Sequence, residues 1–243
     1  MEQYYRNAVN PYDEPMSQGA EWDGSYQAHL PNYSFAEASR YLRMPPSTVR
    51  YWAKGGTVTT PQRRVDFRQV LEGPPRQRLT FLDLTELVVV RDLRVRFNLS
   101  LGTIRRVQEY VRKELGQPWY LYDLRVRGRD IFIMHLEKVP VAATRSGQMA
   151  FANFLEDLLE RVEADAAGVP SRIFPRLDGA HVPKPVQISP IVSFGYPTVA
   201  GTGIKTRTIA SRYDAGEDID FIARDYELPR ESILDAIAFN TAA

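Results

Sequence analysis

The chain has 243 residues, of which 44% are hydrophobic and 25% charged, values ordinary for a globular protein with one large or two small domains. Cysteine is absent and the three histidines lie far apart, so disulfides and zinc-thiolate sites are excluded, and neither a metal site nor a cofactor is expected. No apolar run approaches the roughly 18 residues of a membrane span, and the first residues lack a signal-peptide pattern, which predicts a cytoplasmic protein without a membrane partner.

The net charge of +1 conceals an uneven distribution along the chain. Residues 33–79 contain nine Lys/Arg and three Asp/Glu, whereas residues 213–240 contain two Arg and eight acids. A polyanion such as DNA would be attracted to the first segment and repelled by the second. Residues 1–30 are polar, rich in tyrosine and aperiodic, which predicts a tail that is disordered or docks on another surface.

The first helix-turn-helix pattern covers residues 33–54. Ser34 and Glu37 form a capping box that starts a helix at about Phe35. Met44-Pro45-Pro46 ends this helix near residue 43, and Pro46 starts a second helix that stops at Gly55-Gly56. Two short helices joined by a tight turn are typical of a helix-turn-helix.

A basic hairpin and two longer helices are predicted next. Residues 57–79 contain Gly73-Pro74-Pro75 and favour two short strands around a turn, which would form a wing. Thr80 caps a helix over about 82–97, and Ser100 caps another. In the latter helix, apolar residues recur at helical spacing, namely Leu101, Ile104, Val107, Val111 and Leu115. Residues 120–126 and 131–136 flank Arg127-Gly128-Arg129-Asp130, a hairpin signal.

The second short helix and the wing supply candidate DNA contacts. Base edges require donors from the first turns of a recognition helix, and the candidates are Ser47, Thr48, Arg50 and Lys54. Arg63, Arg64 and Arg68 of the wing are candidates for phosphate contacts. Tyr51 belongs to the same candidate set, although Tyr51 and Trp52 are expected to pack rather than to read bases. The alternative is a packing unit with Arg50 and Lys54 on a solvated face; the basic wing favours DNA.

Residues 33–115 resemble the DNA-binding domain of the MerR family, a winged helix-turn-helix. The resemblance lies in FAEASRYLRMPPSTVRYW, the basic wing, and RLTFLDLTELVVVRDLRVRFNLSLGTIRRV. Pro45 departs from the pattern, since the family usually has a capping Ser or Thr there. The hairpin over 120–136 stands in place of the family's long coiled coil. The resemblance implies a DNA-binding domain over residues 31–138.

Residues 139–187 are predicted to connect two domains. A helix over 149–165 carries one apolar stripe: Phe151, Phe154, Leu155, Leu158, Leu159 and Val162. This stripe needs a cover, for which a homodimer is the leading choice because dimers engage two DNA half-sites. Four prolines within residues 166–187 predict an extended linker.

The last unit, residues 188–243, is predicted to hold three short helices. It opens with strand-like Ile191–Phe194, passes Gly201-Thr202-Gly203 and includes a second helix-turn-helix pattern over 218–240. The glycines lack the spacing of a phosphate loop and more simply serve a tight connection. The last unit contains five carboxylates that indicate a solvated acidic face rather than a metal or acid-base site: Asp218, Asp220, Asp225, Glu231 and Asp235. A further possibility is that this acidic face docks on a basic nuclease surface.

Residues 188–240 resemble a family first catalogued as a domain of unknown function and regarded as bacterial antitoxins of the VapB type. The residues that carry this resemblance are Pro190, Phe194-Gly195, Pro197, Val199, Ala200-Gly201-Thr202-Gly203-Ile204, Ile209, Tyr213, Ala215-Gly216, Ile219, Ile222-Ala223, Tyr226, Ile233 and Ala236. The resemblance implies that the partner is a PIN-like ribonuclease toxin, commonly encoded by an adjacent gene. It also implies that the chain represses its own operon. Candidate toxin contacts are Phe194, Tyr196, Ile204, Arg207 and Tyr213.

Together these patterns predict a mainly α protein with small β-hairpins: a winged helix-turn-helix, a connecting helix with a proline-rich linker, and a three-helix, helix-turn-helix-like domain. The predicted function is a non-enzymatic antitoxin of a type II toxin-antitoxin system that binds operator DNA and the toxin as a homodimer. One alternative is a MerR-like one-component regulator whose C-terminal region senses a small molecule. A second alternative is an enzyme that uses the acidic cluster.

Overall fold

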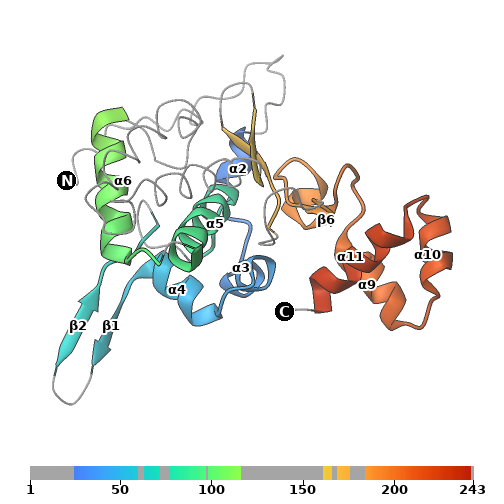
Figure 1. Ribbon diagram of the computed structural model, residues 1–243, viewed down its shortest axis with the longest axis horizontal. Helices are drawn as coiled ribbons and strands as arrows, with labels where there is room; N and C mark the ends of the chain where they lie inside the picture. Colours follow the sequence, from blue (N-terminus) through green and yellow to red (C-terminus); the bar gives the residue numbers. More distant parts are fainter. Residues whose placement is uncertain are drawn as a thin grey trace.

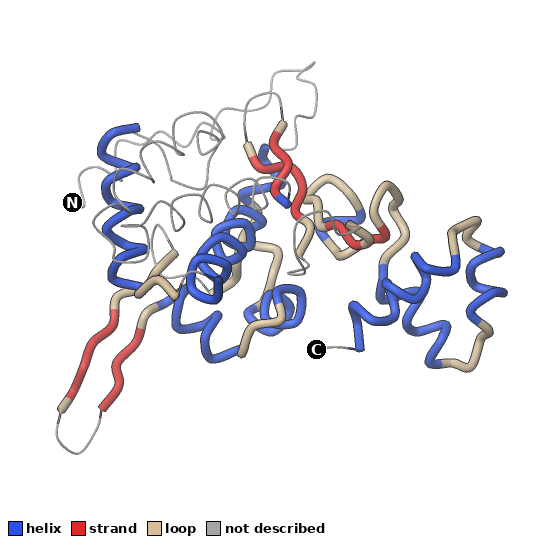
Figure 2. The backbone as a smooth tube through the Cα atoms, in the orientation of Figure 1, coloured by secondary structure: helices blue, strands red, loops and turns tan. Residues whose placement is uncertain are grey.

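The structure is a computed structural model that describes residues 25–59, 63–71, 77–96, 98–115, 161–165, 169–175 and 184–241. These residues form a mainly α fold with small antiparallel strand pairs, as the sequence predicts (Figures 1 and 2). The helices are α2 (Ser25–His29), α3 (Phe35–Leu42), α4 (Pro46–Lys54), α5 (Phe81–Arg96), α6 (Leu101–Leu115), α9 (Thr206–Asp214), α10 (Ile219–Asp225) and α11 (Arg230–Thr241). The strands are β1 (Gly56–Thr59), β2 (Arg64–Phe67), β3 (Val162–Ala164), β4 (Pro170–Ile173), β5 (Val186–Gln187) and β6 (Thr198–Val199), with a 3-10 turn η2 (Ser193–Gly195).

Two hydrophobic cores organise the described residues. The larger core surrounds α5 and includes side chains of α2, α3, α4 and β4; we call these elements with α6, β1, β2 and β3 the N-terminal unit. The smaller core lies among α9, α10 and α11, which with β5, η2 and β6 form the C-terminal unit, residues 186–241. Figure 1 shows the β1–β2 hairpin projecting at one end of the molecule and α9–α11 gathered at the other. Within the described residues, no helix is long and apolar enough to cross a lipid bilayer.

The α3–α4 pair begins and ends where the local chemistry predicts. Ser34 caps α3, since its Oγ accepts from the Glu37 amide at 3.2 Å while Glu37 Oε2 accepts from the Ser34 amide at 2.8 Å. Arg43 ends the helix in the left-handed conformation, with φ of 49°. Pro46 occupies the first turn of α4, where the absence of an amide proton costs no hydrogen bond.

Helices α5 and α6 also start at predicted caps. Thr80 and Asp83 exchange hydrogen bonds, with 2.8 Å from the Thr80 amide to Asp83 Oδ2 and 3.1 Å from the Asp83 amide to Thr80 Oγ1. Ser100 Oγ accepts from the Thr103 amide at 3.0 Å. Residues 81–93 of α5 are all buried, polar ones included, so α5 is the central helix of the N-terminal unit.

The region between the units departs from the prediction. The helix expected over 149–165 lies mostly outside the described residues, but its predicted end is wrong because Val162–Ala164 form β3, antiparallel to β4. Pro170–Ile173 form β4 rather than part of an open linker, and Ile173 is fully buried in the larger core. The hairpin expected over 120–136 and the tail over 1–30, apart from its last residues in α2, lie outside the described residues.

In the C-terminal unit the three predicted helices are present, but the strand predicted at Ile191–Phe194 is absent. Ser193 and Phe194 both adopt left-handed conformations, with φ of 48° and 58°, which end an extended chain and make the turn η2. The strands of this unit are instead β5 and β6, which pair antiparallel with Val186 opposite Val199. Ile188, just after β5, pairs with Ile173 and is buried in the larger core, so the chain enters this unit directly from the N-terminal core.

Candidate nucleic-acid interface

Helix α4 has one buried face and one face directed to solvent. Val49, Trp52 and Ala53 are buried in the larger core. Ser47 and Arg50 are exposed on the opposite face, together with half-buried Tyr51. The helix therefore presents donors to solvent on the face that its apolar residues leave uncovered, with an N-terminus that favours anions.

The candidate donors of α4 differ in how firmly they are held. Lys54 Nζ donates to Gln77 Oε1 at 2.8 Å and lies 5.2 Å from the ring centroid of Phe35. The Arg50 guanidinium lies 5.7 Å from the same ring. The side chains of Ser47 and Thr48 form no hydrogen bond with other residues that the structure describes. Ser47, Thr48 and Arg50 are thus available to an outside acceptor, whereas Lys54 would first have to leave Gln77.

The hairpin that the sequence predicts as a wing is β1–β2, in which Thr57 lies opposite Asp66 and Thr59 opposite Arg64. It confirms the prediction of two short strands; Gly73-Pro74-Pro75, where their turn was expected, lie after both strands and outside the described residues. All three wing arginines are exposed: Arg63, Arg64 and Arg68. Arg64 forms a solvent-exposed ion pair with Asp66 at 3.4 Å, an arrangement that contributes little energy and leaves the guanidinium accessible.

Aromatic packing joins the wing to α4. The rings of Tyr51 and Phe67 meet edge to face with centroids 5.4 Å apart. This contact confirms the expectation that Tyr51 packs, and desolvation raises the pKa of its hydroxyl. Trp52 is buried, as expected, and its carbonyl accepts from the amides of Val70 and Leu71 at 2.8 and 3.1 Å. Helix and wing are therefore held as one surface.

Helix α6 holds the base of the wing from the other side. Arg105 Nε donates to the Gln69 carbonyl at 3.1 Å, and Arg105 Nη2 donates to the Arg68 carbonyl. Burial lowers the pKa of Arg105. Buried Gln108 donates from Nε2 to the Val70 carbonyl at 3.1 Å and to Glu86 Oε1 at 2.8 Å. The sequence places Arg105 away from the apolar stripe but gives no sign of this role, because its partners are backbone carbonyls more than thirty residues away.

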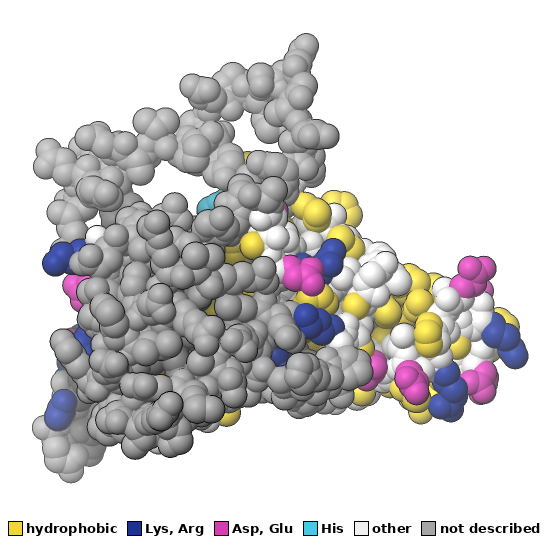
Figure 3. All heavy atoms as spheres, turned by 45° about the horizontal axis from the view of Figure 1, so that its top comes forward, with side chains coloured by type: hydrophobic (Ala, Val, Ile, Leu, Met, Phe, Trp, Pro, Cys, Tyr) yellow, Lys and Arg dark blue, Asp and Glu magenta, His cyan; other side chains and the backbone are white. Residues whose placement is uncertain are grey.

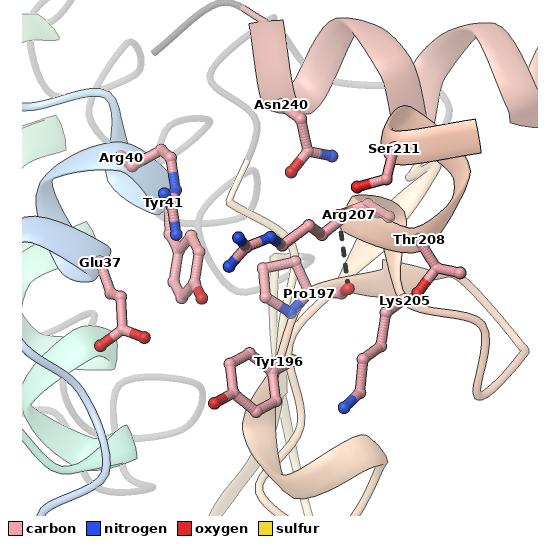
Figure 4. A pocket seen from close by; sticks show the side chains of 11 residues that line it. Glu37, Arg40, Tyr41, Tyr196, Pro197, Lys205, Arg207, Thr208, Ser211 and Asn240 are labelled. Atoms are coloured by element: carbon pink, nitrogen blue, oxygen red, sulfur yellow. Dashed lines mark hydrogen bonds between the residues drawn. The ribbon is translucent and has the colours of Figure 1, made fainter. Parts of the chain in front are cut away.

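The five candidate toxin contacts do not form one patch. The Phe194 side chain is 80% exposed on η2, while Tyr213 is exposed on α9. Half-buried Ile204 packs against the smaller core. Tyr196 and Arg207 line a cleft of about 420 Å³ between α3 and the start of α9 (Figure 4).

The turn that carries Phe194 is anchored on both sides. Ser193 Oγ donates to the Gly203 carbonyl at 2.6 Å, and Asn32 Nδ2 donates to the Phe194 carbonyl at 3.1 Å. Buried Tyr33 donates its hydroxyl to the Gly195 carbonyl at 3.0 Å, and burial raises its pKa. The backbone is thus fixed by the N-terminal unit while the Phe194 ring and the nearby Ile191, 59% exposed, remain in solvent.

Much of the acidic segment has a structural role. Asp218 caps α10 by accepting from the Asp220 and Phe221 amides at 3.0 Å. Arg212 binds Glu217 at 2.6 Å and Asp225 at 2.5 Å, and its hydrogen bonds lower the pKa of Glu217. Arg230 pairs with Asp220 at 2.8 Å. Figure 3 shows both signs of charge on the end of the molecule formed by this unit. The described residues contain no group of three or more acidic or histidine side chains suited to a metal ion.

The chain is similar to known proteins over its C-terminal unit and over most of its length. A family model described as "Protein of unknown function (DUF433)" matches residues 186–240, which is the C-terminal unit. A Mycobacterium tuberculosis protein named "Putative antitoxin VapB45" is 25% identical over 233 residues, covering 86% of this chain and 93% of its own length. The crystal structure of Rv2018 from Mycobacterium tuberculosis has a similar fold, with a TM-score of 0.62 and 21% identity over 86% of this chain and 97% of that chain.

Proposed function

We propose that this chain is a non-enzymatic antitoxin that represses its own operon by binding DNA and neutralises a PIN-like ribonuclease. The antitoxin role draws on the name of the Mycobacterium tuberculosis relative and on the match of residues 186–240 to the DUF433 family. The DNA-binding role draws on the N-terminal unit, which offers a winged helix-turn-helix with solvent-exposed cations.

One observation carries the DNA-binding role: α4 and the wing present their cations on one clamped surface. Val49 and Trp52 fix the helix in the core, and Tyr51 and Arg105 fix the wing to the helices. Arg50 is then placed for base edges in the major groove, with Ser47 and Thr48 beside it. Arg63, Arg64 and Arg68 are placed for phosphates, which contribute affinity without sequence preference.

Toxin binding is assigned to the C-terminal unit. The exposed Phe194 and Ile191 on an anchored turn provide apolar side chains that a partner could bury at little conformational cost. Tyr196 directly follows this turn, and Arg207 and Tyr213 lie on α9 of the same unit. A homodimer would allow two copies of α4 to engage half-sites about one helical turn apart.

The DNA assignment is tested by fluorescence anisotropy titration of the full chain with DNA from its own promoter. Arg50→Ala should weaken specific binding by about 1–3 kcal/mol and reduce the preference over unrelated DNA. Arg68→Ala should weaken both DNAs alike and reduce the salt dependence by about one counterion. Arg224→Ala on α10 is the matched control, because it removes an exposed arginine far from α4. Equal losses for Arg50→Ala and Arg224→Ala would contradict the assignment.

The toxin assignment is tested by co-expression with a neighbouring nuclease gene. Phe194→Ala should abolish co-purification and rescue from the nuclease while leaving promoter binding intact. Leu234→Ala, which removes another exposed apolar side chain of the same unit, serves as the control. Rescue that survives Phe194→Ala would place the toxin contact elsewhere.

A second candidate function is a one-component regulator that senses a small molecule. The observation that favours it is the cleft between α3 and α9, since a ligand there would touch both units. Promoter binding that responds to a small molecule, in a genome without a neighbouring nuclease, would support this alternative.

A further inference from the structure

A cleft between the two units has a polar lining, of which the proposed DNA and toxin contacts use only Tyr196 and Arg207. It measures about 420 Å³ and is walled by α3 on one side and by Tyr196, Pro197 and the first turns of α9 on the other. In Figure 4 the Arg207 side chain extends from α9 toward Arg40 and Tyr41 of α3. A volume in this range is typical of sites for small organic ligands.

Three cations line this cleft without a carboxylate partner. Arg40, Lys205 and Arg207 form no ion pair with any residue that the structure describes. The Arg40 guanidinium lies 5.4 Å from the ring centroid of Tyr41, and Lys205 Nζ lies 4.5 Å from that of Tyr196. Like charges gathered in a concave site repel one another, and an anion between them removes this cost.

The one carboxylate among the described lining residues, Glu37, offsets only part of this charge, and the charge of Arg40 helps to lower the pKa of Glu37. Glu37 Oε2 accepts from the amide and the hydroxyl of Ser34 at 2.8 and 2.7 Å, so it is committed to the capping box of α3. The ion pairs of Arg212 and Arg230 in the same unit show the contrasting arrangement, in which carboxylates lie against guanidinium groups. The cleft thus keeps a net positive charge that the fold itself leaves uncompensated.

The other lining groups favour a phosphate over a single carboxylate. Helix α9 starts in the cleft after Lys205, and its dipole adds positive potential there, although the Thr206 amide already donates to the Pro197 carbonyl at 3.0 Å. The hydroxyls of Thr208 and Ser211 add donors beside the guanidinium groups. A phosphate carries about two charges and several acceptor oxygens, which match this donor set, and arginine binds it in a bidentate manner.

We propose that this cleft binds a small phosphate monoester, with the phosphate between Arg40 and Arg207 and the organic part against the rings of Tyr41 and Tyr196. Because Arg40 belongs to α3 and Arg207 to α9, the ligand stabilises the placement of one unit on the other. Given the proposed DNA binding by α4, ligand and DNA then alter each other's affinity by the same factor.

Calorimetric titration of the full chain with adenosine 5′-monophosphate, inorganic phosphate and adenosine tests this proposal. Both phosphate compounds should bind at millimolar concentration or below, more weakly in high salt, whereas adenosine should not bind. Arg40→Gln and Arg207→Gln should each weaken phosphate binding at least tenfold. Arg224→Gln, whose arginine is exposed on α10 outside the cleft, should leave it unchanged. Absence of binding by both phosphate compounds, or equal binding by parent, Arg40→Gln and Arg207→Gln, would overturn the proposal.

A second measurement separates this site from the proposed function. Promoter DNA binding is measured with and without adenosine 5′-monophosphate. Nucleotide binding that depends on Arg40 and Arg207, without any promoter binding, would support the phosphate site and contradict the DNA-binding role. Promoter binding that depends on Arg50, without binding of any phosphate compound, would support the DNA-binding role and contradict the phosphate site.

Discussion

At the scale of single residues, arginines that the structure describes differ in what their guanidinium groups contact. Arg50 and Arg207 face solvent or a cleft. Arg105 and Arg91 donate to backbone carbonyls inside the N-terminal unit. Arg212 binds two carboxylates. A count of charges along the sequence therefore overestimates the cations available to a polyanion, and the binding proposals use only arginines whose guanidinium groups stay accessible, Arg64 with its exposed Asp66 pair included.

The Ser34–Glu37 capping box makes a prediction about stability and pH. Burial raises the pKa of Glu37, but the hydrogen bonds from Ser34 outweigh it and leave this pKa below its ordinary value of 4.5. A depressed folded pKa stabilises the fold above pH 4.5, and this stabilisation is lost as pH falls through the folded pKa. Glu37→Gln should thus lower the free energy of unfolding near neutral pH, by up to about 1 kcal/mol.

Urea unfolding of parent and Glu37→Gln between about pH 3 and pH 7 provides the measurement. The free energies of unfolding of the parent and Glu37→Gln should become equal as the pH approaches the acidic end of this range. Glu227→Gln removes an exposed carboxylate that forms no side-chain hydrogen bond with other described residues, and it should stay close to the parent throughout. A difference between parent and Glu37→Gln that stays constant with pH would contradict the assigned role of the carboxylate.

At the scale of elements, the sequence correctly predicts those helix starts that are set by residues close in sequence. The starts of α3, α5 and α6 are set by Ser34, Thr80 and Ser100, each of which bonds an amide three residues on. The entry to α4 is likewise set by Pro45-Pro46. Such signals lie within one helical turn, so they can be predicted without knowledge of tertiary structure.

The elements that were predicted wrongly depend on distant partners. Val162 fits the apolar stripe of a helix, but it pairs with Ile173 in a strand. Ile191–Phe194 read as a strand, yet contacts from Asn32 and Tyr33 anchor the turn there. In the candidate interface, the exposed face of α4 could be predicted from its periodicity, whereas the Arg105 clamp and the cleft cations could not. Their geometry depends on how separate segments meet.

The junction between α4 and β2 depends on Gly55. Its φ is +69°, and an added Cβ would meet the Phe67 carbonyl oxygen at 2.5 Å and the Gln69 amide nitrogen at 2.8 Å. Both contacts are with backbone, so Gly55→Ala should displace the wing from α4. We expect a lower melting temperature and weaker promoter binding, measured by thermal unfolding and anisotropy titration.

The neighbouring glycine provides the control for this change. At Gly56 an added Cβ meets only Tyr51 Cδ2, at 3.8 Å, and φ is not positive. Gly56→Ala should therefore stay close to the parent in both measurements. Similar effects of the two substitutions would show that the close approach at Gly55 does not control the wing.

At the scale of the whole molecule, the two units meet through Tyr33 and Gly195. Gly195 has φ of +78°, and an added Cβ would collide with the Tyr33 hydroxyl. Gly201 has nearly the same φ, +76°, with nothing within 4 Å of the added atom. Both alanine substitutions carry a left-handed cost of roughly 1 kcal/mol, but only Gly195→Ala disturbs the contact between units. Gly195→Ala should lower the melting temperature further than Gly201→Ala.

A double-mutant cycle isolates the collision. Tyr33→Phe removes the hydroxyl, leaving Tyr33 Cζ as the nearest ring atom, 3.1 Å from the added Cβ. The destabilisation caused by Gly195→Ala should shrink in the Tyr33→Phe background, whereas that caused by Gly201→Ala should not change. Additive effects of Tyr33→Phe and Gly195→Ala would remove Tyr33 as the cause.

The position of Phe239 has a consequence for how the protein is made. Its ring stacks with that of Tyr41 on α3, with centroids 6.4 Å apart, and is buried in the larger core. A ribosome adds about 5–20 residues per second, and Phe239 is synthesised almost two hundred residues after Tyr41. The Phe239 ring therefore becomes available to α3 only many seconds after α3 has been made. The α3–α4 pair thus gains its complete packing only once the C-terminal unit has emerged, and in a nascent chain cut short before Phe239 the Tyr41 ring keeps Tyr33 as an aromatic neighbour but lacks the Phe239 ring.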